Sequence, residues 1–371
     1  MMTSISRSAL AGATLCLAAF SAPGAQQPAA RGATAPINHV FVIVLENQGY
    51  DTTFGPATRA TYLADTLVKA GALLPQYYGI GHFSLDNYVA MISGIAPNKQ
   101  TQIDCPRYED FVETGTAPDG QPVGLGCVYP THVQTVANQL AAKHRTWKAF
   151  MEDMGKDPSR ERARCGHPVL GSLDSTERAS IGDMYAAKHN PFVYFHAIID
   201  SPSCEQNVVP LTELEAVLRS ASRTPNFSFI SPSLCHDGHD RPCRNGEPGG
   251  LVSANEFLKH WVPLIMASPA FRADGLLIIT FDEALSIDAT ACCNEPSGPN
   301  TLAPGVNGPG GGRTGAVLLS PFIAGGTVSQ TPYNHYSMLK SIEDIFGLPY
   351  LGYAGLPGLA GFGPDVFTRT R

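Results

Sequence analysis

Four short segments of the chain are predominantly apolar, at residues 40–45, 227–230, 276–281 and 316–319. None of them keeps up the long alternation of apolar and polar residues that is typical of a strand with one exposed face. Apolar runs of this length, rich in β-branched and aromatic residues, are typical of strands that are buried on both faces. We therefore predict a largely parallel sheet that is covered on both sides.

Between these segments, apolar residues recur every three or four positions, which is the period of an amphipathic helix. This pattern predicts helices at residues 58–70, 84–93, 132–143, 211–220, 253–267 and 337–346. Strands that alternate with helices indicate an α/β fold with a doubly wound, mostly parallel central sheet flanked by helices. Functional groups in such folds are expected at the carboxyl ends of the strands.

Two stretches lack this regular alternation. Residues 99–207 contain cysteines and prolines in a less regular pattern, and we interpret them as insertions that cover the edge of the sheet. Residues 287–312 are rich in Gly, Pro, Asn and Thr and end in three consecutive glycines. No strand leads into this second stretch and no Lys-Ser/Thr pair follows it, so a flexible surface loop is favoured over a phosphate-binding loop.

The N-terminus has the pattern of an export signal. Arg7 precedes an apolar run at residues 9–20, and small residues follow it, which predicts a signal peptide over residues 1–25. Residues 26–38 are rich in Pro, Ala, Gly and Gln and read as a linker, which leaves residues 39–371 as a single domain. We therefore expect a secreted or periplasmic protein.

Two other interpretations of the N-terminus are weaker. A buried N-terminal helix is disfavoured because the predicted linker would detach it from any core. A lipid anchor at Cys16 is disfavoured because this cysteine lies inside the apolar run and follows the bulky Leu15. After the predicted signal, no apolar run approaches the length of a membrane span.

Composition narrows the class of protein further. Of 371 residues, 43% are hydrophobic and 15% are charged, which is ordinary for a globular protein. The formal net charge is -7 and no basic run appears. A general nucleic-acid binder is disfavoured, because such proteins contact phosphates through clustered Lys and Arg.

Eight cysteines follow the predicted signal, and an even number in an exported protein suggests disulfides. Cys105 with Cys127 and Cys235 with Cys243 are plausible loop staples, although connectivity is not readable from spacing. A zinc site is the alternative, but the sequence contains no CxxC pair.

Acidic and amide side chains follow two of the predicted strands directly. Glu46 and Asn47 come after the strand at 40–45, and Asp282 and Glu283 come after the strand at 276–281. The carboxyl ends of parallel strands face the same edge of a sheet, so these four side chains could meet around one hard cation, which prefers oxygen ligands. The alternative is that they are solvated loop acids.

Ser84 stands at the predicted start of the helix at 84–93 and is a candidate nucleophile. A serine at a helix start is usually only an N-cap, and that interpretation stays open. Beside a cation, however, its hydroxyl can ionise, because the metal and the helix N-terminus both stabilise an alkoxide.

Histidines gather in two further places. The segment 235–240, Cys-His-Asp-Gly-His-Asp, follows the predicted strand at 227–230, and His335 precedes another predicted helix. Imidazoles with a pKa near neutrality suit metal ligation or protonation of a leaving group. Lys188 and His189 could offer positive charge to a phosphate, but a loop turn explains them equally well, and we leave them outside the predicted site.

Six segments together carry a family resemblance: LENQGYDTTFG (45–55), HFSLDNYVAMISG (82–94), YAAKHNPFVYF (185–195), CHDGHD (235–240), LLIITFDE (276–283) and NHYSMLKSIEDIFGLPYLGYA (334–354). In this order they resemble the bacterial phosphoesterase family, which contains secreted acid phosphatases and phospholipases C and shares its core with the alkaline phosphatase superfamily. The chain looks most similar to the small secreted acid phosphatases, including those that act on phosphatidylinositol 3-phosphate, because it stops soon after its last predicted helix.

The resemblance implies roles for individual residues. It implies a divalent cation of unknown identity, bound by Glu46, Asn47, Ser84, Asp282 and Glu283, with Ser84 as the nucleophile. It also implies that further ligands, or acids and charge donors, flank the phosphate: Asp237, His239, Asp240 and His335.

Two departures from the family pattern affect these expectations. The first block has the single acid Glu46 before Asn47, where relatives often show two residues of Glu or Met. The fourth block reads His-Asp-Gly-His-Asp where Asn-Asp-Met-His-Asp is expected, so His236 competes with His239 for the place beside the phosphate.

The leading hypothesis is hydrolysis of phosphate monoesters through a phosphoserine, with His239 or His335 assisting the leaving oxygen. One cation or two would fit, since Asp237, His239 and His335 could hold a second ion. The alternatives are a phospholipase C-type phosphodiesterase and a non-catalytic metal-binding surface module. The expected partner is a small phosphate ester or a phospholipid headgroup; the oligomeric state stays open.

Overall fold

A central sheet of eight strands organises the fold, with the spatial order β11-β2-β10-β9-β1-β8-β6-β7 in this computed structural model. The structure describes residues 1–2 and 35–369. All neighbours in the sheet pair in parallel except where β10 meets β9 and β2. The strands are β1 His39–Leu45, β2 Ala72–Leu74, β6 Trp147–Met151, β7 Val208–Pro210, β8 Phe227–Ser231, β9 Gly275–Phe281, β10 Ala316–Leu319 and β11 Thr327–Val328.

The predicted α/β fold with a mostly parallel sheet is confirmed, and β1, β8, β9 and β10 occupy the four predicted apolar segments. The interpretation of residues 99–207 as edge-covering insertions is wrong in one respect, because β6 lies within the sheet between β8 and β7. The sequence Trp-Lys-Ala-Phe-Met places a charged residue, Lys148, inside this strand and hides its apolar character.

Helices lie between the strands, close to the predicted positions. α3 has the predicted bounds, and Gly94, with a left-handed φ of 70°, ends it as glycine commonly does. The segment at 58–70 instead begins with a π-helical turn at Tyr62–Leu67. The helices are α1 Tyr50–Phe54, α2 Val68–Ala70, α3 Ser84–Ser93, α4 Val136–Ala142, α5 His196–Ile199, α6 Pro202–Asn207, α7 Leu214–Leu218, α8 Gly250–Ala267, α9 Pro269–Asp274 and α10 His335–Phe346.

Shorter elements complete the fold. Two small sheets are formed by β3 (Tyr77–Tyr78) with β12 (Tyr333–Asn334), and by β4 (Val112–Thr116) with β5 (Pro122–Leu125). Single 3-10 turns lie at Thr101–Ile103, Ala187–His189, Pro191–Tyr194, Leu211–Glu213 and Gly352–Gly355. The predicted loop at 287–312 contains no helix or strand in the structure.

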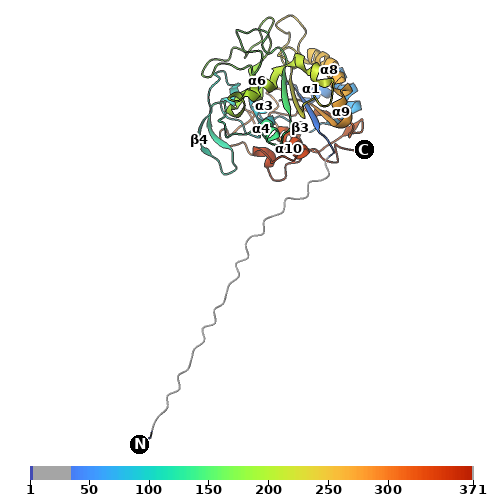
Figure 1. Cartoon of the computed structure of the whole chain (residues 1–371). Helices are drawn as coiled ribbons and strands as arrows, with labels where there is room; N and C mark the ends of the chain where they lie inside the picture. Colours follow the sequence, from blue (N-terminus) through green and yellow to red (C-terminus); the bar gives the residue numbers. More distant parts are fainter. Residues whose placement is uncertain (3–34, 370–371) are drawn as a thin grey trace. The chain divides into compact units, whose positions relative to one another are not determined.

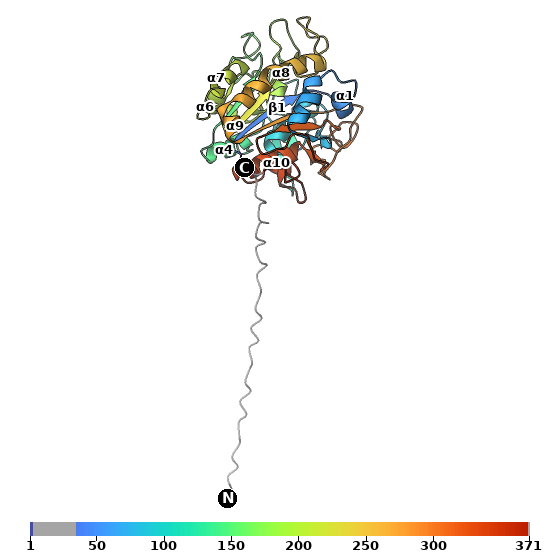
Figure 2. The same cartoon turned by 90° about the vertical axis from the view of Figure 1, so that its right-hand side faces the viewer.

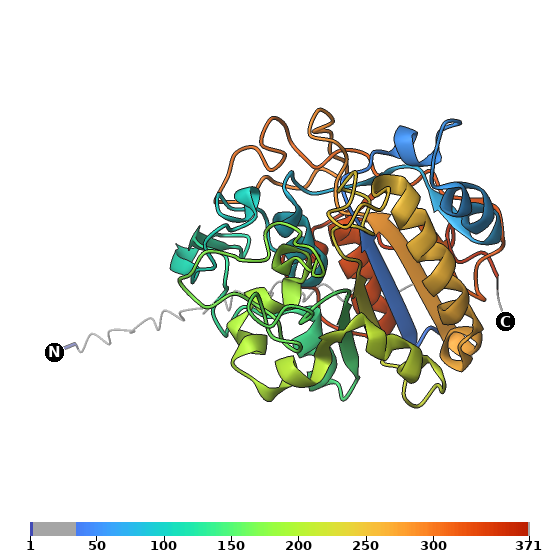
Figure 3. The ribbon, with the colours of Figure 1, turned by 90° about the horizontal axis from the view of Figure 1, so that it is seen from above.

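The sheet is covered by helices on both faces (Figures 1 and 2). Val40, Val42 and Val44 of β1 belong to the hydrophobic core that contains apolar residues of α3 and α10. Phe41 and Ile43 belong to the second core, which contains residues of α8. Figure 3 shows α8 along one side of β1 and β9, with α10 on the other side. Both sets of β1 side chains are therefore buried, which explains why this strand is continuously apolar.

All eight cysteines of the predicted mature chain are paired. The staples that the sequence suggested, Cys105–Cys127 and Cys235–Cys243, are both present. Cys165–Cys204 and the adjacent pair Cys292–Cys293 are the other two. These pairings leave no free thiolate among the cysteines that the structure describes, so the zinc alternative finds no ligand there.

The start of the folded domain lies earlier than predicted. Ile37, which the sequence places in the linker, is buried in the first core, and the backbone N–H of Asn38 donates to Asp274. The predicted signal peptide over residues 1–25 lies outside the described residues except for its first two. Within the described residues, no helix is long and apolar enough to cross a membrane.

Candidate active site

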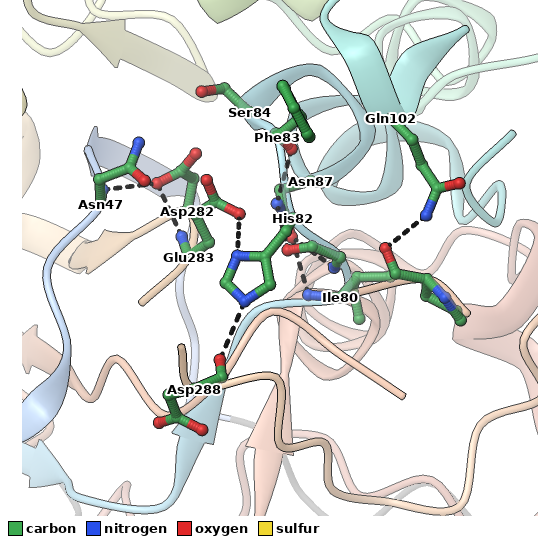
Figure 4. A network of polar contacts seen from close by, with 12 residues as sticks. Asn47, Ile80, His82, Phe83, Ser84, Asn87, Gln102, Asp282, Glu283 and Asp288 are labelled. Carbon is green, nitrogen blue, oxygen red and sulfur yellow. Dashed lines mark hydrogen bonds and ion pairs between the residues drawn. The ribbon is translucent and has the colours of Figure 1, made fainter. Parts of the chain in front are cut away.

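The tips of β1 and β9 meet at the carboxyl edge of the sheet. Leu45 pairs with Phe281 in the parallel register of the two strands, so the acids that follow each strand emerge side by side. The backbone N–H of Asn47 donates to Asp282 Oδ1 at 3.0 Å (Figure 4). Asn47 adopts a left-handed φ of 56°, a conformation that Asn tolerates better than most residues.

Ser84 reaches this cluster from the first turn of α3. Its hydroxyl donates to Glu46 Oε2 at 2.8 Å, and Asn47 Nδ2 donates to the same oxygen at 2.8 Å. The sequence left open whether Ser84 only caps the helix. The N-cap residue is Phe83, which makes no side-chain capping hydrogen bond, and Ser84 is the first residue inside the helix. Its hydroxyl is directed to the carboxylate instead.

Glu283 is held from behind by a histidine. His82 Nδ1 lies 2.6 Å from Glu283 Oε2, and His82 Nε2 lies 2.9 Å from the backbone oxygen of Asp288 (Figure 4). Both contacts are made by a ring that is almost fully buried. His82 thus fixes the orientation of Glu283 and connects it to the loop at 287–312.

Three buried carboxylates in one place raise each other's proton affinity. Burial raises the pKa of Glu46, and repulsion by Asp282 adds to the rise. Burial also raises the pKa of Asp282, with repulsion by Glu283 second. The pKa of Glu283 is raised by burial and then by Glu46. Such a cluster becomes fully ionised at neutral pH when positive charge is supplied.

The donor set fits a divalent cation. Glu46 Oε1 and Asp282 Oδ2 are buried and accept no hydrogen bond from the described residues. An oxygen-only group of carboxylates, an amide and a hydroxyl is the kind of site that hard cations such as Mg²⁺ or Ca²⁺ prefer. The side chains of Glu46, Asn47, Ser84, Asp282 and Glu283, the predicted ligands, are therefore suitable partners for the implied ion.

Lys188 and His189, which we left outside the predicted site, line the same cleft as Glu46 and Ser84. Lys188 Nζ pairs with Asp104 Oδ2 at 2.7 Å. Burial lowers the pKa of Lys188, but Asp104 offsets this effect and the net pKa is raised, so the side chain stays cationic. The segment forms a short 3-10 turn, and both side chains of this turn line the cleft.

His189 faces the carboxylates through its ring edge. Its Nε2 lies 3.2 Å from Glu46 Oε1 and its Nδ1 lies 3.5 Å from Asp237 Oδ2. The ring stacks on Tyr88 of α3, with centroids 5.2 Å apart. Burial, followed by repulsion from Lys188, lowers the pKa of His189, which favours a neutral imidazole. The only sequence signal for Lys188 and His189 was the block YAAKHNPFVYF.

The loop after β8 settles which of its histidines faces the cleft. His239 lines the cleft, and its Nδ1 lies 2.9 Å from Asp240 Oδ1. This hydrogen bond to Asp240 raises the pKa of His239 to about 9. His236 lies instead between Glu152 and Glu247, at 2.9 and 3.2 Å, and does not line the cleft. Of the two competitors, His239 is the one that lines the cleft.

Asp237 and Asp240 support this loop from outside the cleft lining. Asp237 is buried, and its Oδ1 accepts the backbone N–H of His239 at 2.8 Å. Burial and then repulsion by Glu46 raise the pKa of Asp237. Asp240 orients the ring of His239 through the bond already described. Asp240 thus acts through His239, whereas Asp237 also lies beside His189 of the cleft lining, with 3.5 Å between its Oδ2 and the ring Nδ1.

His335 does not have the predicted position beside the phosphate. It is fully buried, its Nε2 lies 2.5 Å from the backbone oxygen of Asp282, and its Nδ1 lies 3.1 Å from Tyr77 Oη. Burial lowers its pKa to about 4, so the ring is neutral. With both nitrogens engaged, His335 supports the turn at Asp282 and leaves neither nitrogen for a second ion or a leaving group.

These residues surround a cleft of about 340 Å³. Its lining includes Glu46, Asn47, Ser84, Lys188, His189, His239 and Glu283. A larger hollow of about 910 Å³ lies beside the β4–β5 hairpin but contains none of these groups. The smaller cleft, which holds the acids, the hydroxyl and the cations, is therefore the candidate active site.

Comparison with known proteins shows the family of this chain. Residues 57–349 match the model of the Phosphoesterase family. The chain belongs to the phosphoesterase family. It is 27% identical over 310 residues to a phosphate-repressible acid phosphatase of Penicillium chrysogenum, covering 84% of this chain and 59% of the relative. It is 23% identical over 316 residues to a phosphatidylinositol-3-phosphatase of Mycobacterium tuberculosis, covering 85% and 79%.

This phosphoesterase spans 59%, 60% and 56% of the length of three fungal acid phosphatase relatives. Among solved structures, a protein of the alkaline phosphatase superfamily from Vibrio parahaemolyticus aligns with a TM-score of 0.49 and 11% identity. That alignment covers 87% of this chain and 72% of the other.

Proposed function

We propose that this phosphoesterase is a metal-dependent phosphatase that hydrolyses phosphate monoesters through a phosphoserine on Ser84. One observation carries the proposal: the Ser84 hydroxyl donates to a buried carboxylate, Glu46, in the lining of a cleft that also contains Lys188 and His239. A nucleophile, a proton acceptor and positive charge for an anion are thus assembled in one place.

The implied cation would be held by Glu46, Asn47, Ser84, Asp282 and Glu283. When bound, such an ion lowers the pKa of a coordinated hydroxyl and neutralises charge on phosphoryl oxygens. The orphaned oxygens of Glu46 and Asp282 support this assignment. The proposal assigns one ion to this site, because both nitrogens of His335 are already engaged.

The chain's own side chains supply the remaining chemistry. Lys188 places a cation in the cleft, where it would bind a phosphoryl oxygen. Ser84 Oγ passes its proton to Glu46 Oε2, to which it is already hydrogen-bonded, and attacks the phosphorus opposite the leaving oxygen.

His239 would then serve the leaving group. Its Nδ1 is bound to Asp240, and its raised pKa of about 9 keeps the ring protonated near neutrality. The Nε2–H can therefore pass its proton to the oxygen as the ester bond breaks. The neutral imidazole of His239 next accepts a proton from the water that attacks the phosphoserine. Glu46 returns its proton to Ser84 Oγ as the bond to phosphorus breaks, which releases phosphate and restores Ser84.

The names of the relatives support this reading, since they include acid phosphatases of fungi and a mycobacterial phosphatidylinositol-3-phosphatase. The substrate we propose is a phosphate ester of a small molecule or of a lipid headgroup. The sequence pattern of an export signal further supports action outside the cytoplasm.

A substrate panel tests the proposal. Purified protein is assayed with phosphate monoesters and diesters from about pH 4 to about pH 9, before and after removal of metal with a chelator. We expect release of phosphate from monoesters, loss of activity with chelator, and recovery when one divalent metal is restored. Faster turnover of the diesters would favour a phosphodiesterase, and activity that survives complete removal of metal would contradict the metal dependence.

A further inference from the structure

Phe83 is an unusual residue at the mouth of the candidate active site. It directly precedes Ser84, lines the cleft, and leaves 43% of its surface exposed (Figure 4). Its backbone has φ 78° and ψ 138°. A bulky side chain at positive φ is a genuine outlier, and such outliers gather at functional sites.

Local structure does not require an aromatic side chain at this position. The Phe83 carbonyl accepts Asn87 Nδ2 at 3.2 Å, and any residue could supply that backbone oxygen. Glycine would adopt this φ without steric cost. A residue that keeps 43% of its surface exposed gains only part of the stabilisation that a core aromatic gains from burial. The phenyl group is therefore explained neither by the backbone nor by the core.

The cleft changes character between its inner and outer parts. The most buried groups of the lining are ionisable, with Glu46, His189 and Glu283 among them. Phe83 is the exposed apolar residue of the lining, because Leu234 is buried. Two exposed apolar residues outside the lining flank Ser286 in sequence, Leu285 at 49% and Ile287 at 92% exposure. Phosphate has its partners in the polar part, so the remainder of an ester would meet the apolar part.

We propose that Phe83 binds the apolar part of the leaving group, and that this site prefers phosphate monoesters of hydrocarbon or aromatic alcohols over small polar ones. The inference rests on the proposed function, because it assumes that Ser84 receives the phosphoryl group. Phe83 is thus a specificity-determining residue, held beside the nucleophile by the same strained turn that begins α3.

The test compares two monoesters whose leaving alcohols have similar acidity, ethyl phosphate and hexyl phosphate. Phe83→Ala should lower the ratio of their kcat/KM values, hexyl over ethyl, by about tenfold, because the longer chain loses its contact surface. Phe83→Tyr keeps a ring and should keep the parental ratio. Phe83→Gly removes the ring and also relieves the backbone strain. If the ring alone determines the preference, its ratio of kcat/KM values should equal that of Phe83→Ala.

Val328→Ala is the matched control, because Val328 is 52% exposed on β11 and does not line the cleft. It should leave both rates unchanged. An equal fall in both rates for Phe83→Ala, or an unchanged ratio, would overturn the inference.

Binding of two unreactive analogues, ethylphosphonate and hexylphosphonate, separates this inference from the proposed function. The parent should bind hexylphosphonate more tightly by calorimetry, and Phe83→Ala should lose that preference. If the preference is present but no ester is hydrolysed, the proposed function fails while the binding role of Phe83 stands. If the parent binds both phosphonates equally, the role of Phe83 fails whatever the hydrolysis assay shows.

Discussion

Replacing Ser84 with alanine separates its chemical role from its structural one. In the structure its hydroxyl donates one hydrogen bond, to Glu46 Oε2 at 2.8 Å, and the residue is buried. A hydrogen bond to a charged group contributes roughly 1.5–3 kcal/mol. Glu46 Oε2 keeps a second donor, Asn47 Nδ2, so we expect Ser84→Ala to lower the free energy of unfolding by only about 1.5 kcal/mol.

The effect on catalysis should be far larger. Without the hydroxyl no phosphoserine can form, so kcat on a phosphate monoester should fall by about 10³-fold or more. The assay is phosphate release at saturating substrate, together with intact-mass measurement of rapidly quenched samples. The parent should show a transient phosphate adduct that the variant lacks.

Ser93→Ala is the matched control on the same helix. Ser93 is also buried, and its hydroxyl donates to the backbone oxygen of Val89 at 2.7 Å, so its loss costs about 1 kcal/mol of stability. This variant should keep parental activity and form the adduct. Turnover by Ser84→Ala within about tenfold of the parent would refute the assignment of Ser84 as nucleophile.

Three further perturbations test other parts of the site. Glu46→Gln should lower the divalent metal bound per chain, measured by elemental analysis, by more than about tenfold. It should also raise the Tm of chelator-treated protein, because it removes one of three mutually repelling buried carboxylates. Unchanged metal content would contradict the ligand role of Glu46. Lys188→Met leaves the buried Asp104 carboxylate without its counter-ion and should lower the free energy of unfolding, measured in urea, by about 3 kcal/mol. Adding Asp104→Asn should recover much of that loss. If the effects of the two substitutions simply add in the double variant, the two side chains are not coupled. The hydrogen bond to Glu152 raises the pKa of His236 to about 9, so its contribution to stability is complete below about pH 6.5 and is lost as the pH rises through about 9. Unfolding of His236→Gln from about pH 6 to about pH 10 should lack that slope, and an identical pH dependence in parent and variant would contradict it.

Much of the fold follows from local pattern. Residues 40–45 and 276–281 are apolar on both sides of the strand, and this alone indicates a sheet whose two faces are both buried. Because the two strands are parallel, the acids that follow them share an edge of the sheet, so the sequence alone predicts that Glu46 lies near Asp282. The same pattern did not predict β6, because Lys148 interrupts its apolar run.

The site was predictable only where its residues follow a recognisable element. Ser84 stands at the start of a clear helical pattern, whereas Lys188 and His189 lie in a single 3-10 turn inside an irregular stretch. Their importance comes from contacts across long sequence separations, such as that of Lys188 with Asp104, 84 residues away. The spacing of apolar residues within a short segment cannot predict such a contact.

The sequence by itself determined the strand tips, the helix that carries Ser84 and the family resemblance, because these depend on short-range periodicity and on motif order. Only the tertiary structure decided between chemically equivalent candidates. It directs His239 into the cleft, binds His236 between two glutamates and buries His335 behind Asp282. An imidazole has the same intrinsic chemistry at each position, so its role depends on burial and on the groups that its two nitrogens meet.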